Sequence, residues 1–215
     1  MLVGGNISVT SFTGDKGTEE SFRNLSNNCP NIIHLATHGM YIAPEVVDEK
    51  RKENNFAFLE SIINEKDPVK EDIALTHSFL VLSGGNSLIQ RNTMLDSESD
   101  GILTAKDISR INLNNLDLVV LSACESALGD MDNEGVYGLQ RGFKKAGANT
   151  ILMSLAKVDD EATKILMVEF YRSLMNGKTK HESLQEAQKH LREVENGKYN
   201  NPKYWAYFIM LDGLN

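Results

Sequence analysis

The sequence contains little cysteine and no long apolar segment, and both absences narrow the class of protein. Two cysteines in 215 residues, Cys29 and Cys124, are too few for a disulfide framework. No CxxC or paired Cys/His spacing indicates a zinc site, so we expect no metal and no cofactor. The N-terminus has neither the basic flank nor the apolar core of a signal peptide, and no apolar run approaches the ~20 residues that span a bilayer. We therefore expect a cytoplasmic protein with no membrane partner.

Positive charge is also scarce. The chain has 22 Lys and Arg against 30 Asp and Glu, a formal net charge of −8. Such a surface repels phosphate backbones, so we expect no nucleic-acid partner and a weak preference for basic peptides. The length and the 41% apolar content suffice for a full core, and they predict a single domain over residues 1–215.

Strand and helix patterns alternate along the chain. Short apolar or alternating runs are strand candidates at residues 7–12, 31–37, 78–83, 116–123, 149–155 and 204–211. Helical spacing occurs at 136–146, 161–175 and 183–194, and the first two of these end at Gly147 and at Asn176-Gly177. The alternation predicts a layered α/β fold with a largely parallel sheet.

The segment 45–72 is rich in charge and carries one possible amphipathic helix, at residues 56–63. We interpret it as a surface insertion. A solvated loop with one helix is the commoner meaning of such a segment, and a flap that gates a substrate site is the alternative.

Two predicted strands end in residues that can do chemistry. His38 and Gly39 follow the strand in IIHLATHGM, and Cys124 follows the strand in DLVVLSACESALGD. Because ligands gather at the carboxyl ends of parallel strands, the imidazole and the thiol could meet in one cleft. A thiol with a pKa of about 8.5 is mostly protonated at neutral pH, and a nearby His can raise its thiolate fraction. On these residues alone, a packed buried Cys124 remains the commoner alternative.

Gly39 adds a candidate oxyanion donor. Without a side chain, its backbone N–H can approach a substrate carbonyl closely. Together with the N–H of Cys124 it could form an oxyanion hole.

Several segments in order resemble the CHAT domain, the caspase-like peptidase domain associated with tetratricopeptide repeats, in the caspase/separase group. They are IIHLATHG, ALTHSFLVLSGGN, GILTAKDISRINLNNLDLVVLSACESALGD, the stretch from GVYGLQRGF to YRSLMNG, and PKYWAYFIMLDG. The resemblance implies a caspase-like three-layer α/β/α sandwich with a mostly parallel sheet of about six strands. It also implies a cysteine endopeptidase that cleaves protein or peptide substrates with a His38/Cys124 dyad.

The same resemblance has consequences for the rest of the protein. It implies an upstream helical-repeat domain or regulatory partner. It also implies that the chain could lack the N-terminal strand of the domain, because the family usually has further sequence before SVTSFTGDKG. A catalytically silent protein-interaction module of the same fold is the alternative function.

The stretch AKVDDEATK resembles a family loop that walls the S1 pocket. The resemblance implies that Asp160, or Asp159 in its place, could bind a basic P1 residue through a charge-assisted pair. The alternative is structural: one of these aspartates caps the following helix, and Glu161 complements its dipole. The two roles are compatible.

The remaining histidines have simpler interpretations. His34 and His38 have even spacing, so one strand would place both on one face, with His34 packed in the core. The polar surroundings of His77, His181 and His190 predict surface residues.

Overall fold

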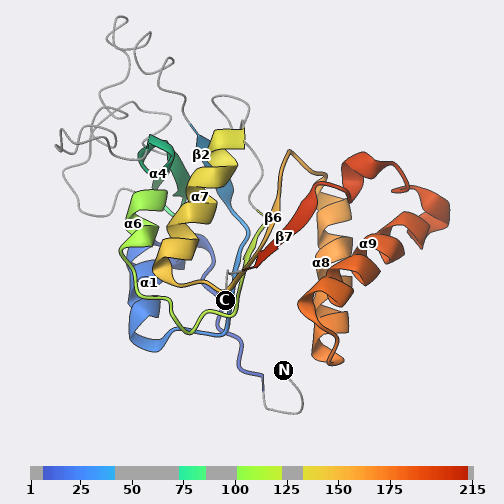
Figure 1. The fold of residues 1–215 in the computed structure, drawn as a ribbon, viewed down its shortest axis with the longest axis horizontal. Helices are drawn as coiled ribbons and strands as arrows, with labels where there is room; N and C mark the ends of the chain where they lie inside the picture. The colour runs from blue at the N-terminus through green and yellow to red at the C-terminus, as the bar shows by residue number, and fades with distance from the viewer. Residues whose placement is uncertain (1–6, 42–72, 86–100, 123–132, 213–215) are drawn as a thin grey trace, which may run out of the picture. The chain divides into compact units, whose positions relative to one another are not determined.

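The chain is a mixed α/β protein in two compact units. The structure, a computed structural model, describes residues 7–41, 73–85, 101–122 and 133–212 (Figure 1). The larger unit consists of residues 12–151 and 211–215, and the smaller unit consists of residues 1–11 and 152–210. The predicted insertion at 45–72 lies outside the described residues. Whether the chain is one functional domain stays a prediction.

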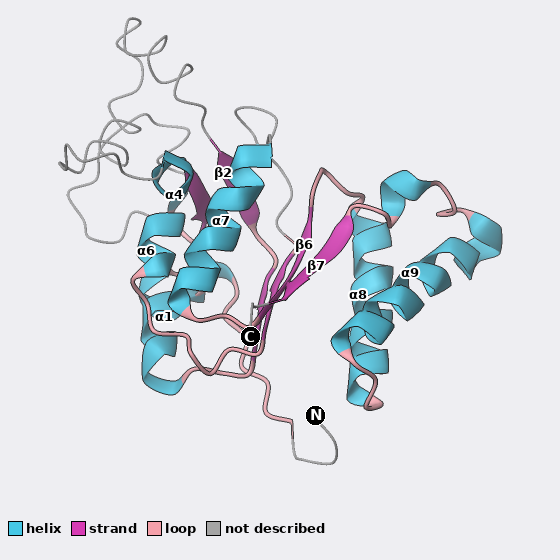
Figure 2. Cartoon of the chain, in the orientation of Figure 1, coloured by secondary structure: helices cyan, strands magenta, loops and turns pink. Residues whose placement is uncertain are grey.

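Among the described residues, the main sheet has four strands, in the order β1-β5-β6-β7. Figure 2 shows β6 and β7 next to each other. They are β1 (Ile32–Leu35), β5 (Leu118–Leu121), β6 (Thr150–Ser154) and β7 (Phe208–Asp212). Strands β1 and β5 are parallel. The amides of Asn149 and Thr150 donate to the carbonyls of Leu116 and Asp117, which brings the chain into β6 beside β5. The sheet is mostly parallel, as the sequence predicts.

Burial explains why the central strands read as continuous apolar runs. Every residue of β5 and of β6 is buried. A parallel strand covered on both faces cannot alternate between apolar and polar side chains, because neither face meets water.

A second sheet was not foreseen. Strands β2 (His38–Tyr41), β3 (Ser78–Val81) and β4 (Ile102–Thr104) pair antiparallel in the order β2-β3-β4. The predicted strand at 78–83 therefore belongs to this sheet and not to the parallel one. The chain changes sheets at Ala36 and Thr37, where the Thr37 hydroxyl donates to the Val81 carbonyl.

The predicted strand at residues 7–12 is wrong. This stretch is assigned to no strand, and its apolar side chains Ile7 and Val9 are 60% and 83% exposed. Alternation gives a segment β-propensity, but a strand also needs an edge to pair with, and no described strand pairs with this one.

The described part of the larger unit also contains short helices and one long helix. They are η1 (Gly14–Lys16), α1 (Glu19–Arg23), η2 (Asn24–Asn28), α4 (Ile73–His77), α6 (Ala105–Ser109) and α7 (Asn133–Ala146). Two glycines let α7 approach its neighbours closely. A Cβ on Gly138 would lie 2.0 Å from Ser78 Oγ, and a Cβ on Gly142 would lie 2.5 Å from the Ala105 carbonyl oxygen.

A buried carboxylate fastens α1 to the start of β4. Glu19 is 2% exposed, and its Oε1 accepts from the amides of Gly101 and Ile102 at 2.8 and 3.1 Å. Its other oxygen pairs with Arg23 at 2.9 Å. A buried charge with this many partners is tolerated, whereas removal of one partner would be costly.

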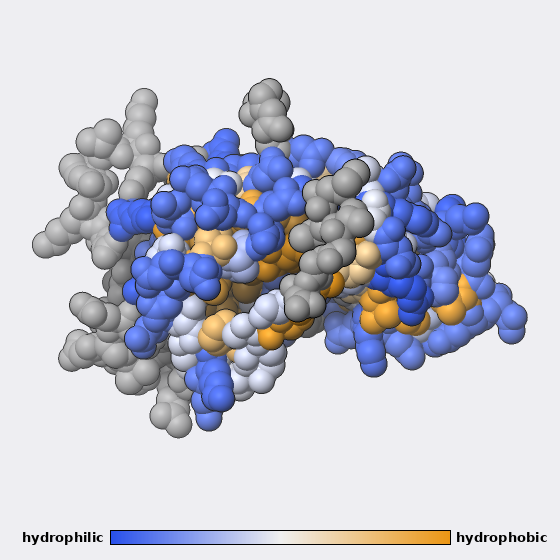
Figure 3. Space-filling model, turned by 90° about the horizontal axis from the view of Figure 1, so that it is seen from below, coloured by the Kyte–Doolittle hydropathy of each residue, from blue (hydrophilic) through white to orange (hydrophobic). Residues whose placement is uncertain are grey.

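The smaller unit is built on two packed helices, α8 (Asp160–Met175) and α9 (Lys180–Gly197), followed by η3 (Pro202–Tyr204). A capping box between Thr179 and Glu182 begins α9. Helical backbone angles stop before Val194, and Glu195 and Asn196 have positive φ, so the regular helix ends close to the predicted end at 194. Figure 3 shows a mainly hydrophilic surface with smaller apolar patches. No helix among the described residues is long and apolar enough to cross a membrane.

Candidate functional site

Strands β1 and β5 end side by side. Their last paired residues are Leu35 and Leu121. One residue further, Ser122 donates its amide to the Leu35 carbonyl at 3.1 Å, and its hydroxyl reaches the same oxygen at 3.3 Å. The ends of the two strands are thus fastened together by the residue that stands two positions before Cys124.

His34 takes part in the same junction. Its Nε2 lies 3.0 Å from Ser122 Oγ. The prediction of a core histidine is wrong, because the His34 side chain is exposed, although partial desolvation lowers its pKa. The expected shared face with His38 is also wrong, since β1 ends at Leu35 and His38 belongs to another sheet. Sequence spacing alone gives no signal of such a change of sheet.

His38 is the first residue of β2. It pairs with Val81, and its side chain is exposed, whereas Gly39 opposite Leu80 is buried. The turn before His38 is held by the hydrogen bond from Thr37 to Val81. The imidazole is therefore accessible on a backbone that is fixed on both sides.

Cys124 lies outside the described residues, but the register of the strands before it is defined. Each β1–β5 pair differs by the same number of positions, as in Ile32 with Leu118 and Leu35 with Leu121. His38 and Cys124 have this same separation, and each stands three residues beyond the last pair. Where Cys124 lies relative to His38 stays a prediction.

The two aspartates at the start of α8 have different local roles. Asp159 is the N-cap, and its Oδ1 accepts from the Ala162 amide at 2.9 Å. Asp160 occupies the first turn and is exposed. The capping alternative is thus confirmed for Asp159. Contact of either carboxylate with substrate stays a prediction, as does their relation to His38, which lies in the other unit.

A charged cluster at the same end of α8 was not foreseen from the sequence. Tyr199 OH donates to Glu161 Oε2 at 2.8 Å, and Lys198 Nζ lies 3.3 Å from the same oxygen. Lys198 also pairs with Glu195 at 3.0 Å. The Tyr199 hydroxyl and the Lys198 ammonium lower the pKa of Glu161.

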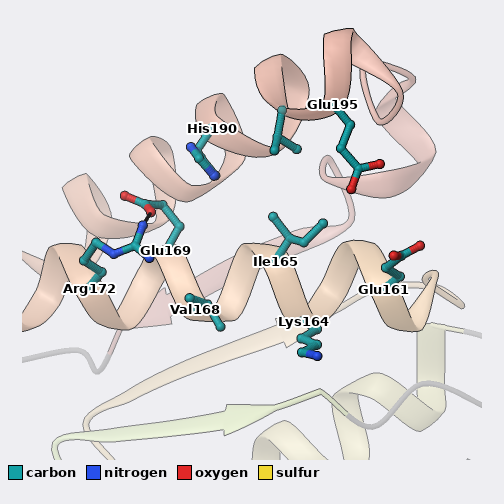
Figure 4. A pocket seen from close by; sticks show the side chains of 9 residues that line it. Glu161, Lys164, Ile165, Val168, Glu169, Arg172, His190 and Glu195 are labelled. Atoms are coloured by element: carbon teal, nitrogen blue, oxygen red, sulfur yellow. Dashed lines mark hydrogen bonds and ion pairs between the residues drawn. The ribbon is translucent and has the colours of Figure 1, made fainter.

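The cluster borders a shallow hollow of about 370 Å³ along α8 and α9 (Figure 4). Three apolar and six polar or charged residues line it: Glu161, Lys164, Ile165, Val168, Glu169, Arg172, His190, Val194 and Glu195. Within the described ranges, no three His, Cys, Asp or Glu side chains form a metal-binding group.

Of the remaining histidines, two are exposed and one is buried. His181 and His190 are exposed, which confirms their prediction as surface residues. The same prediction is wrong for His77, which is 7% exposed and has its Nδ1 3.0 Å from Thr76 Oγ1. Its polar neighbours in the sequence misled the prediction, because they lie on a short helix that α7 covers.

The described residues form a mixed α/β fold in which two parallel strands, β1 and β5, end side by side. The pattern of the CHAT domain family matches residues 2–213, so the chain belongs to that family. It is 37% identical over 111 residues to tetratricopeptide repeat protein 28 of Mus musculus and 28% identical over 180 residues to the Homo sapiens protein of that name. These matches cover 51% and 83% of this chain but only 4% and 7% of the relatives.

Proposed function

We propose that this chain is a cysteine endopeptidase domain of caspase-like architecture, with Cys124 as nucleophile and His38 as general acid and base. The observation that carries the proposal is the register of β1 and β5. Strands β1 and β5 end side by side at Leu35 and Leu121, and His38 and Cys124 each follow three positions later in the sequence. The accessible imidazole of His38 and membership of the CHAT family support it.

The proposed reaction has two halves. The Cys124 thiolate attacks the peptide carbonyl carbon, and the N–H groups of Gly39 and Cys124 donate to the oxyanion. His38 gives its proton to the leaving amine, the C–N bond breaks and a thioester remains. His38 then takes a proton from water, and the resulting hydroxide cleaves the thioester to a carboxylic acid and the Cys124 thiolate, which restores the starting pair of thiolate and protonated His38. No cofactor enters either half.

The substrate class follows from acidic groups at the start of α8. Asp160 is exposed and makes no capping bond, so it is the better candidate to pair with a basic P1 side chain. Asp159 already accepts from Ala162 and has one oxygen left for a second partner. We propose protein or peptide substrates that are cleaved after Arg or Lys.

Two further features belong to the same proposal. The relatives are named for tetratricopeptide repeats, and we propose that a helical-repeat region or regulatory partner acts with this domain. We also propose a cytoplasmic setting, because a reducing compartment keeps the Cys124 nucleophile as a free thiol.

The test is labelling of Cys124 by an acyloxymethyl ketone with a basic P1 residue, in a Cys29→Ser background that leaves one thiol. We expect rapid labelling of that chain, none after Cys124→Ala, and much slower labelling after His38→Ala. A matched probe with Asp at P1 reports the S1 preference. Iodoacetamide, which needs no peptide site, serves as the control for thiol accessibility.

Two outcomes decide against the proposal. Labelling no faster than that of a free thiol, and insensitive to His38→Ala, would establish the catalytically silent interaction module in its place. Faster reaction with the Asp probe would refute the acidic S1 assignment of Asp159 and Asp160 while leaving the dyad intact.

A further inference from the structure

Helix α8 carries apolar side chains on two opposite faces. One face is core: Leu166 and Phe170 have no exposed surface. On the opposite face Ile165 is half-buried and Val168 is 51% exposed. Two neighbouring β-branched residues on the solvent face of a helix are unusual for an amphipathic helix with only one covered side.

On the solvent face, the charged and apolar side chains are arranged symmetrically along the helix. Glu161, Ile165, Val168 and Arg172 follow one another at spacings of four, three and four, so they form a single stripe, here called the α8 stripe. Its middle is apolar, one end is acidic and the other is basic. Glu161 lies as far before the midpoint as Arg172 lies after it.

We propose that the α8 stripe is a self-association surface, on which α8 of a second copy of this chain packs antiparallel about a two-fold axis. In that arrangement Glu161 of each copy meets Arg172 of the other, and Ile165 meets Val168. A two-fold interface uses the same patch twice and so requires a patch that is complementary to itself.

The charged residues at the two ends of the α8 stripe can each form further hydrogen bonds. Tyr199 and Lys198 both bond Oε2 of Glu161, and Oε1 has no partner among the described residues. Arg172 pairs with Glu169 through Nη1 only, which leaves its other guanidinium N–H groups available within the described part of the chain. The side chains of Glu161 and Arg172 are 64% and 59% exposed.

The hollow beside α8 could accommodate the apolar residues in the middle of the α8 stripe of a second copy. Ile165 of α8 and Val194 of α9 both line it, and Figure 4 shows Ile165 on the side of α8 that faces α9. A Val168 side chain from a second copy would fill part of this volume of about 370 Å³ and remove the exposed apolar surface from water. A hollow of this kind favours a contact in which one side chain inserts between those of the other helix over a contact between two flat helix faces.

The expected complex is weak. A single helix pair with a shallow hollow falls below the ~1,200 Å² of total buried area that marks standard stable interfaces. Self-association should therefore be sought at high micromolar concentration by sedimentation equilibrium, up to about 500 μM, where millimolar to micromolar affinities are measurable.

The first test removes the apolar middle. Val168→Asp should weaken the dimer at least about tenfold, a loss of about 1.4 kcal/mol. Val9→Asp is the matched control, because Val9 is another exposed valine but lies outside α8, and it should leave the dimer unchanged. A monomeric wild-type chain at 500 μM, or equal effects of both variants, would overturn the proposal.

The second test uses the symmetry. Glu161→Arg and Arg172→Glu should each abolish self-association, because each places like charges opposite one another. Mixed together, the two variants should form a heterodimer, since every Arg then meets a Glu. Thermal melting of each variant establishes that it is folded before mixing. No complex on mixing, or assemblies that grow beyond a dimer, would contradict a closed two-fold contact.

Discussion

The ends of β1 and β5 and the start of α8 are both proposed to serve the substrate, but they are built differently. At the strand ends, backbone pairing and the Ser122 bonds to Leu35 fix the chain before any side chain acts. At the start of α8, the carboxylates are exposed, and Asp159 is already engaged as the helix cap. Substitutions at the first region should therefore change geometry and chemistry together, whereas those at the second should separate stability from specificity.

The largest expected effect comes from disturbing the close packing of α7 at Gly138. Gly138→Ala places a methyl group 2.0 Å from Ser78 Oγ and 2.1 Å from the Ala74 carbonyl oxygen, at the start of the strand that pairs with β2. We expect a loss of about 3 kcal/mol in the free energy of unfolding, measured by urea denaturation. Gly17→Ala is the control, because its nearest contact is 3.4 Å and the change should be small. Equal stabilities of the two variants would contradict the tight packing of α7.

A smaller effect is expected where the two strand ends are joined. Ser122→Ala removes the hydroxyl that reaches the Leu35 carbonyl and His34, at a cost of about 1 kcal/mol in stability. If this hydroxyl helps to position the chain that leads to Cys124, kcat/KM for a peptide substrate should fall about tenfold, and the loss should appear in kcat rather than in KM. Ser122→Thr keeps the hydroxyl and should restore both. A variant with reduced stability and unchanged kcat would limit Ser122 to a structural role.

At the start of α8, we expect Asp159 to contribute to stability and Asp160 to substrate specificity. Asp159→Ala loses the cap to Ala162 and should destabilise the chain by about 1 kcal/mol in thermal or urea unfolding. Asp159→Asn keeps an acceptor and should cost less. Asp160→Ala should change stability by less than about 0.5 kcal/mol. If Asp160 forms the S1 site, that variant should nonetheless lose preference for basic P1 residues in a peptide-library profile.

The smallest effect concerns pH at the strand ends. Desolvation lowers the pKa of His34 below its ordinary value near 6.5, so the unfolded chain binds a proton that the folded chain binds less readily. Stability should therefore rise with pH in the window just below 6.5 and be lost as pH falls through it. His34→Gln removes the titrating group. Unfolding free energies at pH 5 to 7.5 should show a shallower pH dependence for the variant than for wild type, and identical slopes would contradict this.

The sequence anticipated the elements that are specified locally. Helices α7, α8 and α9 lie close to the predicted ranges, because their apolar spacing is a local signal, as are Gly147 and Asn176-Gly177 at the ends of α7 and α8. The buried strands β5 and β6 were equally clear, since continuous β-branched runs indicate burial on both faces. The candidate dyad came from residue type and family resemblance together.

The remaining features depend on pairing between distant segments. Residues 7–12 have strand-like alternation, yet no described edge accepts them. His77 has polar neighbours in the sequence, yet α7 packs over its helix. Local propensity carries no information about which distant segment will cover a residue, so both predictions failed for the same reason.

By itself, the sequence determined the α/β class, the positions of the long helices, and the residues capable of nucleophilic chemistry. Only the tertiary structure decided that the chain leaves the parallel sheet after Leu35, that Ser122 joins the two strand ends, and that His38 begins a strand of a second sheet. Periodicity is a property of one segment, whereas register and change of sheet are set by hydrogen bonds between segments more than 40 residues apart.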